Sequence, residues 1–189
     1  MGRGTASCAA LERIGKSVAM RITGGAYKGR RPKVAKSFKG RPTTDFGRES
    51  LFNLLRSRVD LEGLTVLELF AGTGMVGLEF FSRGCASVVS VEKDAAAVRG
   101  MYGVARAWEL ETWQIVRADA LGFIKKSLTQ FDLVFADPPY DLPELTQIPA
   151  LVLEGALLVP GGWFILEHGE RTDVSQVLGF KETRKYGHV

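Results

Sequence analysis

The sequence predicts an α/β fold in which helices cover both faces of a mostly parallel sheet. Short, almost wholly apolar segments recur from residue 64 onward, and each is followed by a stretch with helical periodicity. Strands that are buried on both faces have this continuous apolar character, and a helix is the usual connection between parallel neighbours. Right-handed connections bring the carboxyl ends of the strands to one edge of the sheet, so we expect a ligand site there.

Each element follows from its local pattern. In the first expected helix, residues 46–56, one face carries the side chains of Leu51, Phe52, Leu54 and Leu55, and Thr44 or Asp45 can serve as the N-cap. Pro160-Gly161-Gly162 should turn the chain before the last strand. The expected strands are 64–70, 87–91, 112–116, 131–136 and 163–167, and the other expected helices are 75–82, 94–107, 120–126 and 145–153.

The composition is that of a globular protein. Hydrophobic residues make up 46% of the 189 residues, which is enough apolar material for one buried core. No apolar run approaches the roughly 20 residues of a membrane helix, and the N-terminus lacks the pattern of an export signal. The two cysteines and two histidines are not spaced as metal ligands. We therefore expect a reduced, cytoplasmic, metal-free protein that is not attached to a membrane.

Positive charge is concentrated in the first third of the chain. Residues 1–60 hold 14 Lys/Arg against 4 Asp/Glu, whereas residues 61–189 hold 11 against 17. Basic residues this close together repel one another unless a polyanion is present, so the pattern favours nucleic-acid binding, with a solvated, partly disordered leader as the alternative. Tyr27 and Phe38 lie among these charges and could stack on bases. The expected RNA contacts are Lys28, Arg30, Arg31, Lys33 and Arg41.

We divide the chain into three parts. Residues 1–19 form a leader that we expect to be disordered or foreign to the native protein. Residues 20–45 form a basic arm, which the glycines at 24 and 25 should bend into a hairpin. Residues 46–189 form the α/β domain.

A glycine-rich turn follows the first expected strand. Gly72, Gly74 and Gly77 satisfy the pattern G-x-G-x-x-G between a strand and a helix, where the backbone turns sharply and a nucleotide-like ligand can lie against it. The pattern alone does not choose between a dinucleotide and S-adenosylmethionine, and a tight turn without a ligand remains an alternative. The segment that we expect to touch the ligand comprises Glu68, Phe70, Gly72, Thr73 and Gly74.

Two acids follow the next two strands at the same expected edge. Glu92 ends the second strand, where a carboxylate accepts hydrogen bonds from ribose hydroxyls in this fold class. Asp119 follows the third strand together with Ala120, and its carboxylate could accept from an adenine amino group or cap the next helix. Both ligands under consideration carry adenosine, so these acids support a site without identifying its occupant.

Asp137-Pro138-Pro139-Tyr140 is the most specific pattern in the chain. The two prolines fix φ and withhold two backbone N–H groups, which leaves a rigid surface rich in hydrogen-bond acceptors. An exocyclic base amine is a poor nucleophile that such acceptors would orient. The Asp137 carboxylate and the Pro138 carbonyl suit that task, Asp137 or water could receive the released proton, and Tyr140 could stack on the base. A rigid turn without catalytic function is the alternative.

Taken together, these residues resemble the class I methyltransferases of exocyclic amines, which have a Rossmann-like fold. More narrowly, the chain resembles the bacterial 16S ribosomal RNA guanine-N2 methyltransferases, the small-subunit "D" enzymes. The discriminating segment is the run from Arg41-Pro42-Thr43-Thr44-Asp45 to Arg48-Glu49-Ser50-Leu51-Phe52-Asn53, which methyltransferases in general lack. The resemblance also covers Arg21-Ile22-Thr23-Gly24-Gly25, Lys28-Gly29-Arg30, Phe70-Ala71-Gly72-Thr73-Gly74, Gly77-Leu78-Glu79 and the Asp137 segment, and it has no counterpart for residues 1–19.

The resemblance implies a cofactor, a substrate and further contacts. It implies S-adenosylmethionine as methyl donor, a guanine of small-subunit ribosomal RNA as acceptor, and assembled or partly assembled subunits as partner. It implies that Thr43 and Thr44 help to enclose the cofactor, that the basic arm grips RNA, and that residues 180–189 belong to an antiparallel hairpin that closes the sheet.

Three alternatives stay open. An NAD-binding oxidoreductase would share the glycine turn and Glu92 but would leave the Asp137 segment and the basic arm unexplained. A methyltransferase of another exocyclic amine, in DNA adenine or cytosine or in protein glutamine, is closer, although the chain is too short for a separate DNA-reading domain. A catalytically silent RNA-binding or assembly factor is disfavoured by the intact Asp137 and glycine turn.

Overall fold

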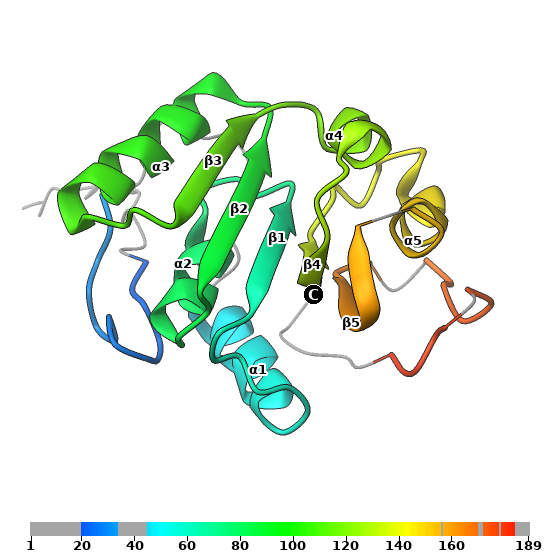
Figure 1. Cartoon of the computed structure of the whole chain (residues 1–189), viewed down its shortest axis with the longest axis horizontal. Coiled ribbons are helices and arrows are strands. Elements are labelled where there is room, and N and C mark those ends of the chain that lie inside the picture. Colours follow the sequence, from blue (N-terminus) through cyan, green and yellow to red (C-terminus); the bar gives the residue numbers. More distant parts are fainter. Residues whose placement is uncertain (1–19, 34–44, 156, 170–171, 178, 184–189) are drawn as a thin grey trace, which may run out of the picture.

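The computed structural model describes residues 20–33, 45–155, 157–169, 172–177 and 179–183. Its centre is a five-stranded parallel sheet in the order β3-β2-β1-β4-β5 (Figure 1). The predicted fold class is confirmed. The strands are β1 (Thr65–Leu69), β2 (Ser87–Glu92), β3 (Trp113–Arg117), β4 (Phe131–Ala136) and β5 (Leu158–Leu166).

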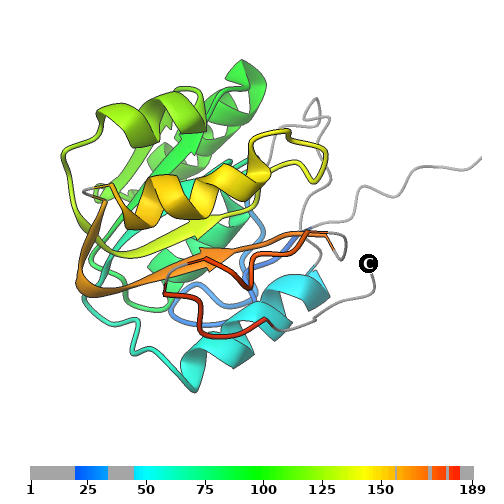
Figure 2. The same cartoon turned by 90° about the vertical axis from the view of Figure 1, so that its right-hand side faces the viewer.

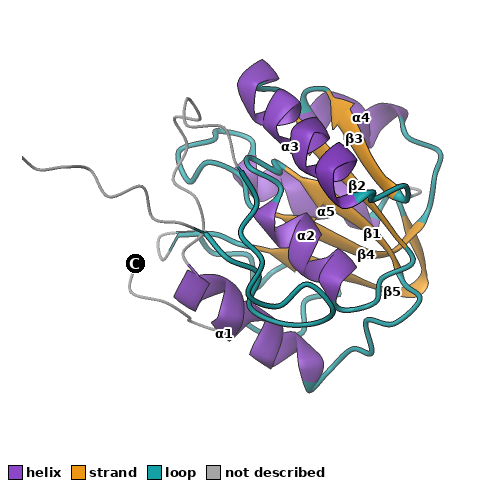
Figure 3. Cartoon of the chain, turned by 90° about the vertical axis from the view of Figure 1, so that its left-hand side faces the viewer, coloured by secondary structure: helices purple, strands orange, loops and turns teal. Residues whose placement is uncertain are grey.

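Helices cover both faces of this sheet. The strands place alternate side chains on opposite faces, so Val66 and Val88 meet one set of helices while Leu67 and Val89 meet the other. The first face carries α1 (Asp45–Arg56), α2 (Met75–Ser82) and α3 (Ala95–Trp108), which stand in front of the sheet in Figure 3. The second carries α4 (Ala120–Lys126), the 3₁₀ turn η1 (Leu145–Gln147) and α5 (Ile148–Leu153), and Figure 2 shows α5 and α1 on opposite sides of β5.

The last part of the chain differs from the prediction. The expected turn at 160–162 does not precede β5 but lies inside it as an irregularity of the β4–β5 register, with Gly161 at a φ of 80°. A bulge accommodates the extra residues without ending the strand. The expected C-terminal antiparallel hairpin of residues 180–189 lies mostly outside the described residues. Before it, the Val177 N–H donates to Val174 O and the Phe180 N–H to Val177 O in local turns, and every strand pairing in the described sheet is parallel.

The basic arm is folded onto the domain. Its backbone reverses between Ile22 and Arg30: the Ile22 N–H donates to Arg30 O at 2.9 Å and the Gly29 N–H to Ile22 O at 2.8 Å, as expected for the glycine-rich stretch. Ser82 at the end of α2 holds the turn, since its hydroxyl donates to Gly24 O at 2.6 Å and accepts from the Tyr27 N–H at 2.9 Å. Met20 and Ile22 are buried in the core of the first face.

A buried ionic cluster fixes the arm to α1 and α2. The Glu79 carboxylate is fully buried and accepts from the Thr23 N–H at 2.6 Å and from the Arg83 guanidinium. Arg48, also fully buried, lies 3.6 Å from Glu79 and donates to Arg21 O at 2.8 Å. Buried charges need such partners, because removing one would leave the other uncompensated.

No helix among the described residues is both long enough and apolar enough to cross a bilayer.

Candidate functional site

The carboxyl ends of the five strands form one edge of the sheet, as predicted (Figure 1). The strand order places the functional segments in a line along that edge. After β3 comes Asp119, at the end of β2 Glu92, after β1 the glycine-rich turn, after β4 Asp137 and after β5 Glu167. The turn therefore lies between the acid expected to hold ribose and the acid expected to hold an amine.

The glycine-rich turn has a backbone that few residues adopt. Phe70, Gly72 and Gly74 all have positive φ, at 58°, 54° and 73°. Such a conformation is strained for phenylalanine, and strain of this kind persists where surrounding structure enforces it. Here the end of β2 enforces it, because the Ala71 N–H donates to Val91 O at 3.0 Å and the Gly72 N–H to the Glu92 carboxylate at 2.8 Å. Thr73, between the two glycines, is half-buried.

Glu68 lies beneath the turn. Its carboxyl group is buried and accepts from the Gly77 N–H at 2.9 Å and from the Ser90 hydroxyl, which in turn accepts from the Trp113 indole N–H at 2.8 Å. Burial raises the pKa of Glu68 to about 7, while the hydrogen bonds from Ser90 and Gly77 oppose that rise. Sequence reasoning missed Ser90 and Trp113, because nothing in their spacing indicates that they meet Glu68.

Two glycines of the motif are required by packing. A β-carbon on Gly74 would lie 2.6 Å from the Met101 sulfur and 2.7 Å from the Trp113 ring. A β-carbon on Gly77 would run into the Glu68 carboxylate. Gly77 thus lets α2 approach β1 closely, and Gly74 lets the turn pack against α3 and β3.

Glu92 holds the two loops on either side of it. One of its oxygens accepts from the Gly72 N–H at 2.8 Å, and the other accepts from the Asp94 N–H at 2.7 Å. A carboxylate has about four acceptor positions, so these bonds leave capacity for hydroxyl donors. The buried Glu92 carboxylate is thereby prealigned beside the turn.

Asp119 acts as a helix cap. It is the N-cap of α4, and its carboxylate accepts from the Gly122 N–H at 2.8 Å. Ala120 is buried against the core of the second face. The capping interpretation of Asp119 is therefore realised, and a contact of either residue with a ligand stays a prediction.

The Asp137 segment leaves the sheet directly beside the glycine-rich turn. Ala136 and Leu69 are partners in the β1–β4 ladder, so Asp137 and Phe70 begin neighbouring loops. Asp137 is half-buried, Pro138 is buried and Tyr140 is exposed. The two loops on which the amine-methylation hypothesis depends thus start from adjacent strands, which lie about 4.8 Å apart.

Tyr140 is anchored to the neighbouring strand. Its hydroxyl donates to the Glu167 carboxylate at 3.1 Å. Burial, followed by the negative charges of Glu167 and Asp137, raises the pKa of Tyr140 well above its usual value, so the hydroxyl remains a donor. Sequence reasoning missed Glu167, although the signal was the same as for Glu92: an acid at the end of an apolar strand.

The basic arm lies near the amino ends of the strands, at the end of the sheet opposite the candidate site. Helices α2 and α3 run back from the carboxyl ends of the strands, and the arm contacts their last residues. The Tyr27 ring packs 5.6 Å from that of Trp108, and the Arg30 guanidinium lies 4.1 Å from the centre of the same Trp108 ring. Tyr27 is thus part of the fold. Lys28, Arg30, Arg31 and Lys33 are exposed, whereas Thr43, Thr44, Arg41 and Phe38 lie outside the described residues.

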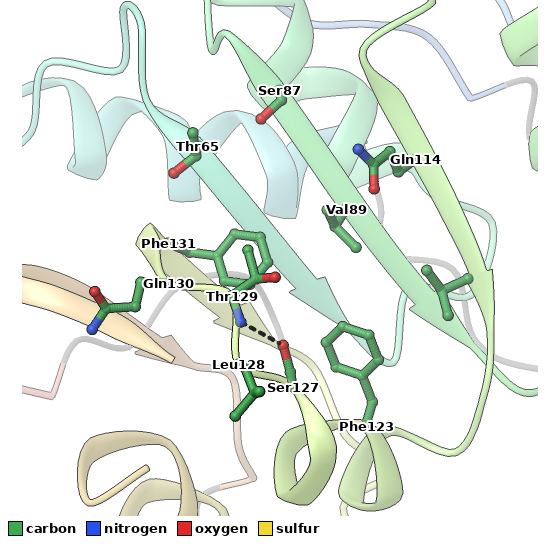
Figure 4. Close-up of a pocket in the computed structure, with 11 residues that line it drawn as sticks. Thr65, Ser87, Val89, Gln114, Phe123, Ser127, Leu128, Thr129, Gln130 and Phe131 are labelled. Atoms are coloured by element: carbon green, nitrogen blue, oxygen red, sulfur yellow. Dashed lines mark hydrogen bonds between the residues drawn. The ribbon is translucent and has the colours of Figure 1, made fainter. Parts of the chain in front are cut away.

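The cavity in Figure 4 is separate from this site. It has a volume of about 380 Å³ and lies on the face of α4, near Thr65 and Ser87 at the amino ends of β1 and β2. Its lining, which includes Gln114 and Phe123, carries no ionisable side chain. It therefore offers no group for acid–base chemistry. Among the described residues there is also no cluster of His, Cys, Asp and Glu that could hold a metal ion.

Comparison with known proteins places the chain in a family. The family described as "Conserved hypothetical protein 95" matches residues 20–189. The chain belongs to this family. Residues 1–19, which we expected to lack a counterpart, fall outside the match.

Relatives and solved structures agree with this assignment. The "Putative rRNA methyltransferase YlbH" of Bacillus subtilis is 34% identical over 85% of this chain and 88% of its own length. The "Ribosomal RNA small subunit methyltransferase D" of Haemophilus influenzae is 30% identical over 78% of each chain. Among solved structures, the "Putative methyltransferase yhhF" of Escherichia coli superimposes with a TM-score of 0.75 at 28% identity, covering 85% of this chain and 86% of its own. The fold is the Rossmann-like fold of class I methyltransferases.

Proposed function

We propose that the chain transfers a methyl group from S-adenosylmethionine to the exocyclic N2 amine of a guanine in 16S ribosomal RNA. The proposal rests on one geometric observation above all. The glycine-rich turn and the Asp137 segment leave adjacent parallel strands at the same edge of the sheet. A bound cofactor and a base amine can then meet between them.

The residues at the turn fit an adenosine cofactor. The backbone of Phe70–Gly74 would face its methionine part, the Glu92 carboxylate has acceptor capacity for ribose hydroxyls, and Asp119 could accept from the adenine amine. When bound, S-adenosylmethionine supplies an electrophilic methyl group carried on a sulfonium.

The Asp137 segment would prepare the amine. The Asp137 carboxylate and the Pro138 carbonyl would accept the two N–H bonds of the amine, turn its lone pair toward the cofactor, and leave Asp137 or water to take the released proton. The Tyr140 ring would hold the base in plane. Catalysis of this kind is mostly positioning, which needs neither a nucleophilic side chain nor a metal.

Ribosomal RNA as substrate is supported by the relatives' names and by the charge of the arm. A groove of about 760 Å³ runs between the arm and the end of α1. Its charged lining comprises Lys28, Arg56, Arg58 and Arg83 together with the acids Glu49 and Asp60, and Arg83 is paired with Glu79. Arg58 is likewise paired with Glu182, so the charge that supports RNA binding is that of the exposed arm residues Lys28, Arg31 and Lys33.

The direct test is methyl transfer. The protein is incubated with labelled S-adenosylmethionine and small ribosomal subunits or 16S RNA that lack the modification, and the labelled base is mapped. We expect label on the N2 amine of one guanine. Label on adenine N6, on cytosine N4 or on a protein glutamine would replace the guanine assignment, and equilibrium dialysis that finds binding of NAD alone would overturn the methyltransferase proposal.

Asp137→Ala separates catalysis from binding. Because Asp137 is expected to orient the amine, the variant should lose at least about 100-fold in kcat. Its affinity for RNA should stay within about twofold, since the arm and the groove are untouched. Equal activity in the variant and the wild type would contradict the catalytic role of Asp137.

A further inference from the structure

A second carboxylate stands beside Asp137. Ala136 of β4 and Leu166 of β5 are partners in the ladder, and the Glu167 N–H donates to Ala136 O at 2.8 Å. The pairing thus extends one residue beyond the strand, so Asp137 and Glu167 are neighbours at the ends of adjacent strands. The end of the sheet at the candidate site therefore carries two acids on adjacent strands.

Tyr140 is hydrogen-bonded to Glu167 and lies near Asp137. Its hydroxyl donates to one oxygen of Glu167 at 3.1 Å, and its ring lies against the backbone of Gly169, where an added β-carbon would be 3.3 Å from the ring. Both carboxylates are close enough to Tyr140 to affect its titration. A carboxylate has about four acceptor positions, and the tyrosine hydroxyl occupies one of those on Glu167. The wall behind the proposed base site therefore carries two carboxylates, Asp137 and Glu167, on adjacent strands.

The Watson–Crick edges of the bases differ in how well they bind to carboxylate acceptors. Guanine presents three N–H bonds on adjacent atoms, one on N1 and two on the N2 amine. Adenine and cytosine present an amine beside a bare ring nitrogen, which is an acceptor and is repelled by a carboxylate. Proteins that read unstacked bases do so through hydrogen bonds to this edge.

We propose that Glu167 selects guanine by accepting a hydrogen bond from the N1–H, while Asp137 and Pro138 accept those of the N2 amine. This inference rests on the proposed function. It adds a specificity-determining residue to the site and gives a reason why the target is guanine among the exocyclic amines that an Asp-Pro-Pro-Tyr segment could serve.

The test uses a base that keeps the amine and lacks the N1–H. In 2-aminopurine the N2 amine is present, but N1 is a bare acceptor. RNA substrates that carry guanine or 2-aminopurine at the mapped target position are incubated with the wild type, with Glu167→Gln and with Glu167→Ala. The value of kcat/KM is measured for each combination of enzyme and RNA. The control is Glu154→Gln, which changes an exposed acid at the end of α5, on the opposite edge of the sheet.

The expected results differ for each variant. The wild type and the control should prefer guanine by at least about tenfold, as a good bidentate contact allows. Glu167→Gln should bring the preference within about threefold, because its amide can accept from the guanine N1–H through its oxygen or donate to the bare N1 of 2-aminopurine through its nitrogen. Glu167→Ala should lose the preference without gaining activity on 2-aminopurine.

Outcomes that overturn the inference are distinct from failure of the proposed function. If both Glu167 variants bind S-adenosylmethionine as the wild type does and keep its preference for guanine, Glu167 does not read N1. If the wild type methylates neither RNA, the proposed function itself fails. Thermal midpoints and cofactor affinity by equilibrium dialysis establish that each variant is folded.

Discussion

At the scale of single residues, the glycine-rich turn depends on positions that no other residue fills easily. Gly74 has a φ of 73°, and a β-carbon added there would clash with the side chains of Met101 and Trp113. Phe70 adopts a similar φ at the cost of strain. Hydrogen bonds from Ala71 and Gly72 to the end of β2 hold the turn, and the Gly74 N–H donates within it to Ala71 O. The shape of the turn is thus enforced by the protein before any ligand arrives.

Gly74→Ala should destabilise the fold and weaken cofactor binding. The added β-carbon would lie 2.6 Å from the Met101 sulfur. Overpacking together with a left-handed backbone should lower the free energy of unfolding by about 2–4 kcal/mol, measured by urea denaturation. Affinity for S-adenosylmethionine should fall in parallel.

Gly103→Ala is the matched control. Gly103 lies within α3, and no atom would come within 4 Å of an added β-carbon. Alanine should therefore raise stability by about 0.5–1 kcal/mol through its better helix propensity. If the two alanine variants destabilised the protein equally, the packing argument for Gly74 would fail.

At the scale of elements, the unit formed by β1, the turn and α2 is joined to β2 and β3 through one buried acid. Glu68 on β1 contacts the start of α2 at Gly77 and reaches Trp113 of β3 through Ser90 of β2. Three strands and a helix therefore share one hydrogen-bond network directly below the proposed cofactor. The protonation state of Glu68 should then affect stability.

The sign of that effect follows from the pKa. Burial raises the pKa of Glu68 from 4.5 to about 7, so between these values the folded protein binds more protons at this site than the unfolded chain. The Glu68 contribution to stability is therefore full below about pH 4.5, declines as the pH rises to about 7 and is then constant. The loss should amount to at most about 3 kcal/mol.

Glu68→Gln isolates this contribution. The variant cannot ionise at position 68, so the difference in free energy of unfolding between wild type and variant should change across pH 4.5–7 and stay level above pH 7. Urea denaturation at a series of pH values measures it. A difference that is independent of pH would show that Glu68 does not titrate in this range.

At the scale of the whole molecule, the basic arm and the candidate site lie at opposite ends of the strands. The arm contacts Ser82 and Trp108, the last residues of α2 and α3, whereas Asp137 follows the carboxyl end of β4. Strands of five or six residues separate the two ends by about 17–20 Å. An RNA that is held by the arm and methylated at Asp137 must therefore extend along the protein, which suits a structured RNA better than a short oligonucleotide.

The salt dependence of RNA binding tests the role of the arm. The double variant Lys28→Ala, Arg31→Ala removes two exposed charges of the arm. If both contact phosphates, the slope of log K against log salt concentration should become shallower by about 1.4–1.8. The control, Lys125→Ala with Lys126→Ala, removes two charges from the end of α4 on the other face and should leave the slope unchanged. Equal slopes in both double variants would argue against RNA contact by the arm.

Much of the fold was predictable because it depends on local patterns. Helices α2 and α4 and strand β4 have the predicted bounds, and the other strands before β5 agree within one or two residues. Apolar runs and glycine turns specify such elements without reference to the rest of the chain. The irregular β5 escaped prediction because a bulge depends on the register of its neighbour β4.

By itself the sequence determined the fold class and the edge of the sheet at which the motifs meet, and it predicted the chemistry of Asp137-Pro138-Pro139-Tyr140. Only the tertiary structure decided what those groups touch. It placed Glu68 under the turn with Ser90 and Trp113, used Tyr27 for packing and brought Glu167 to Tyr140. These contacts join residues 22 to 81 positions apart, and no periodicity in a sequence encodes which distant side chains will meet once the strands are ordered.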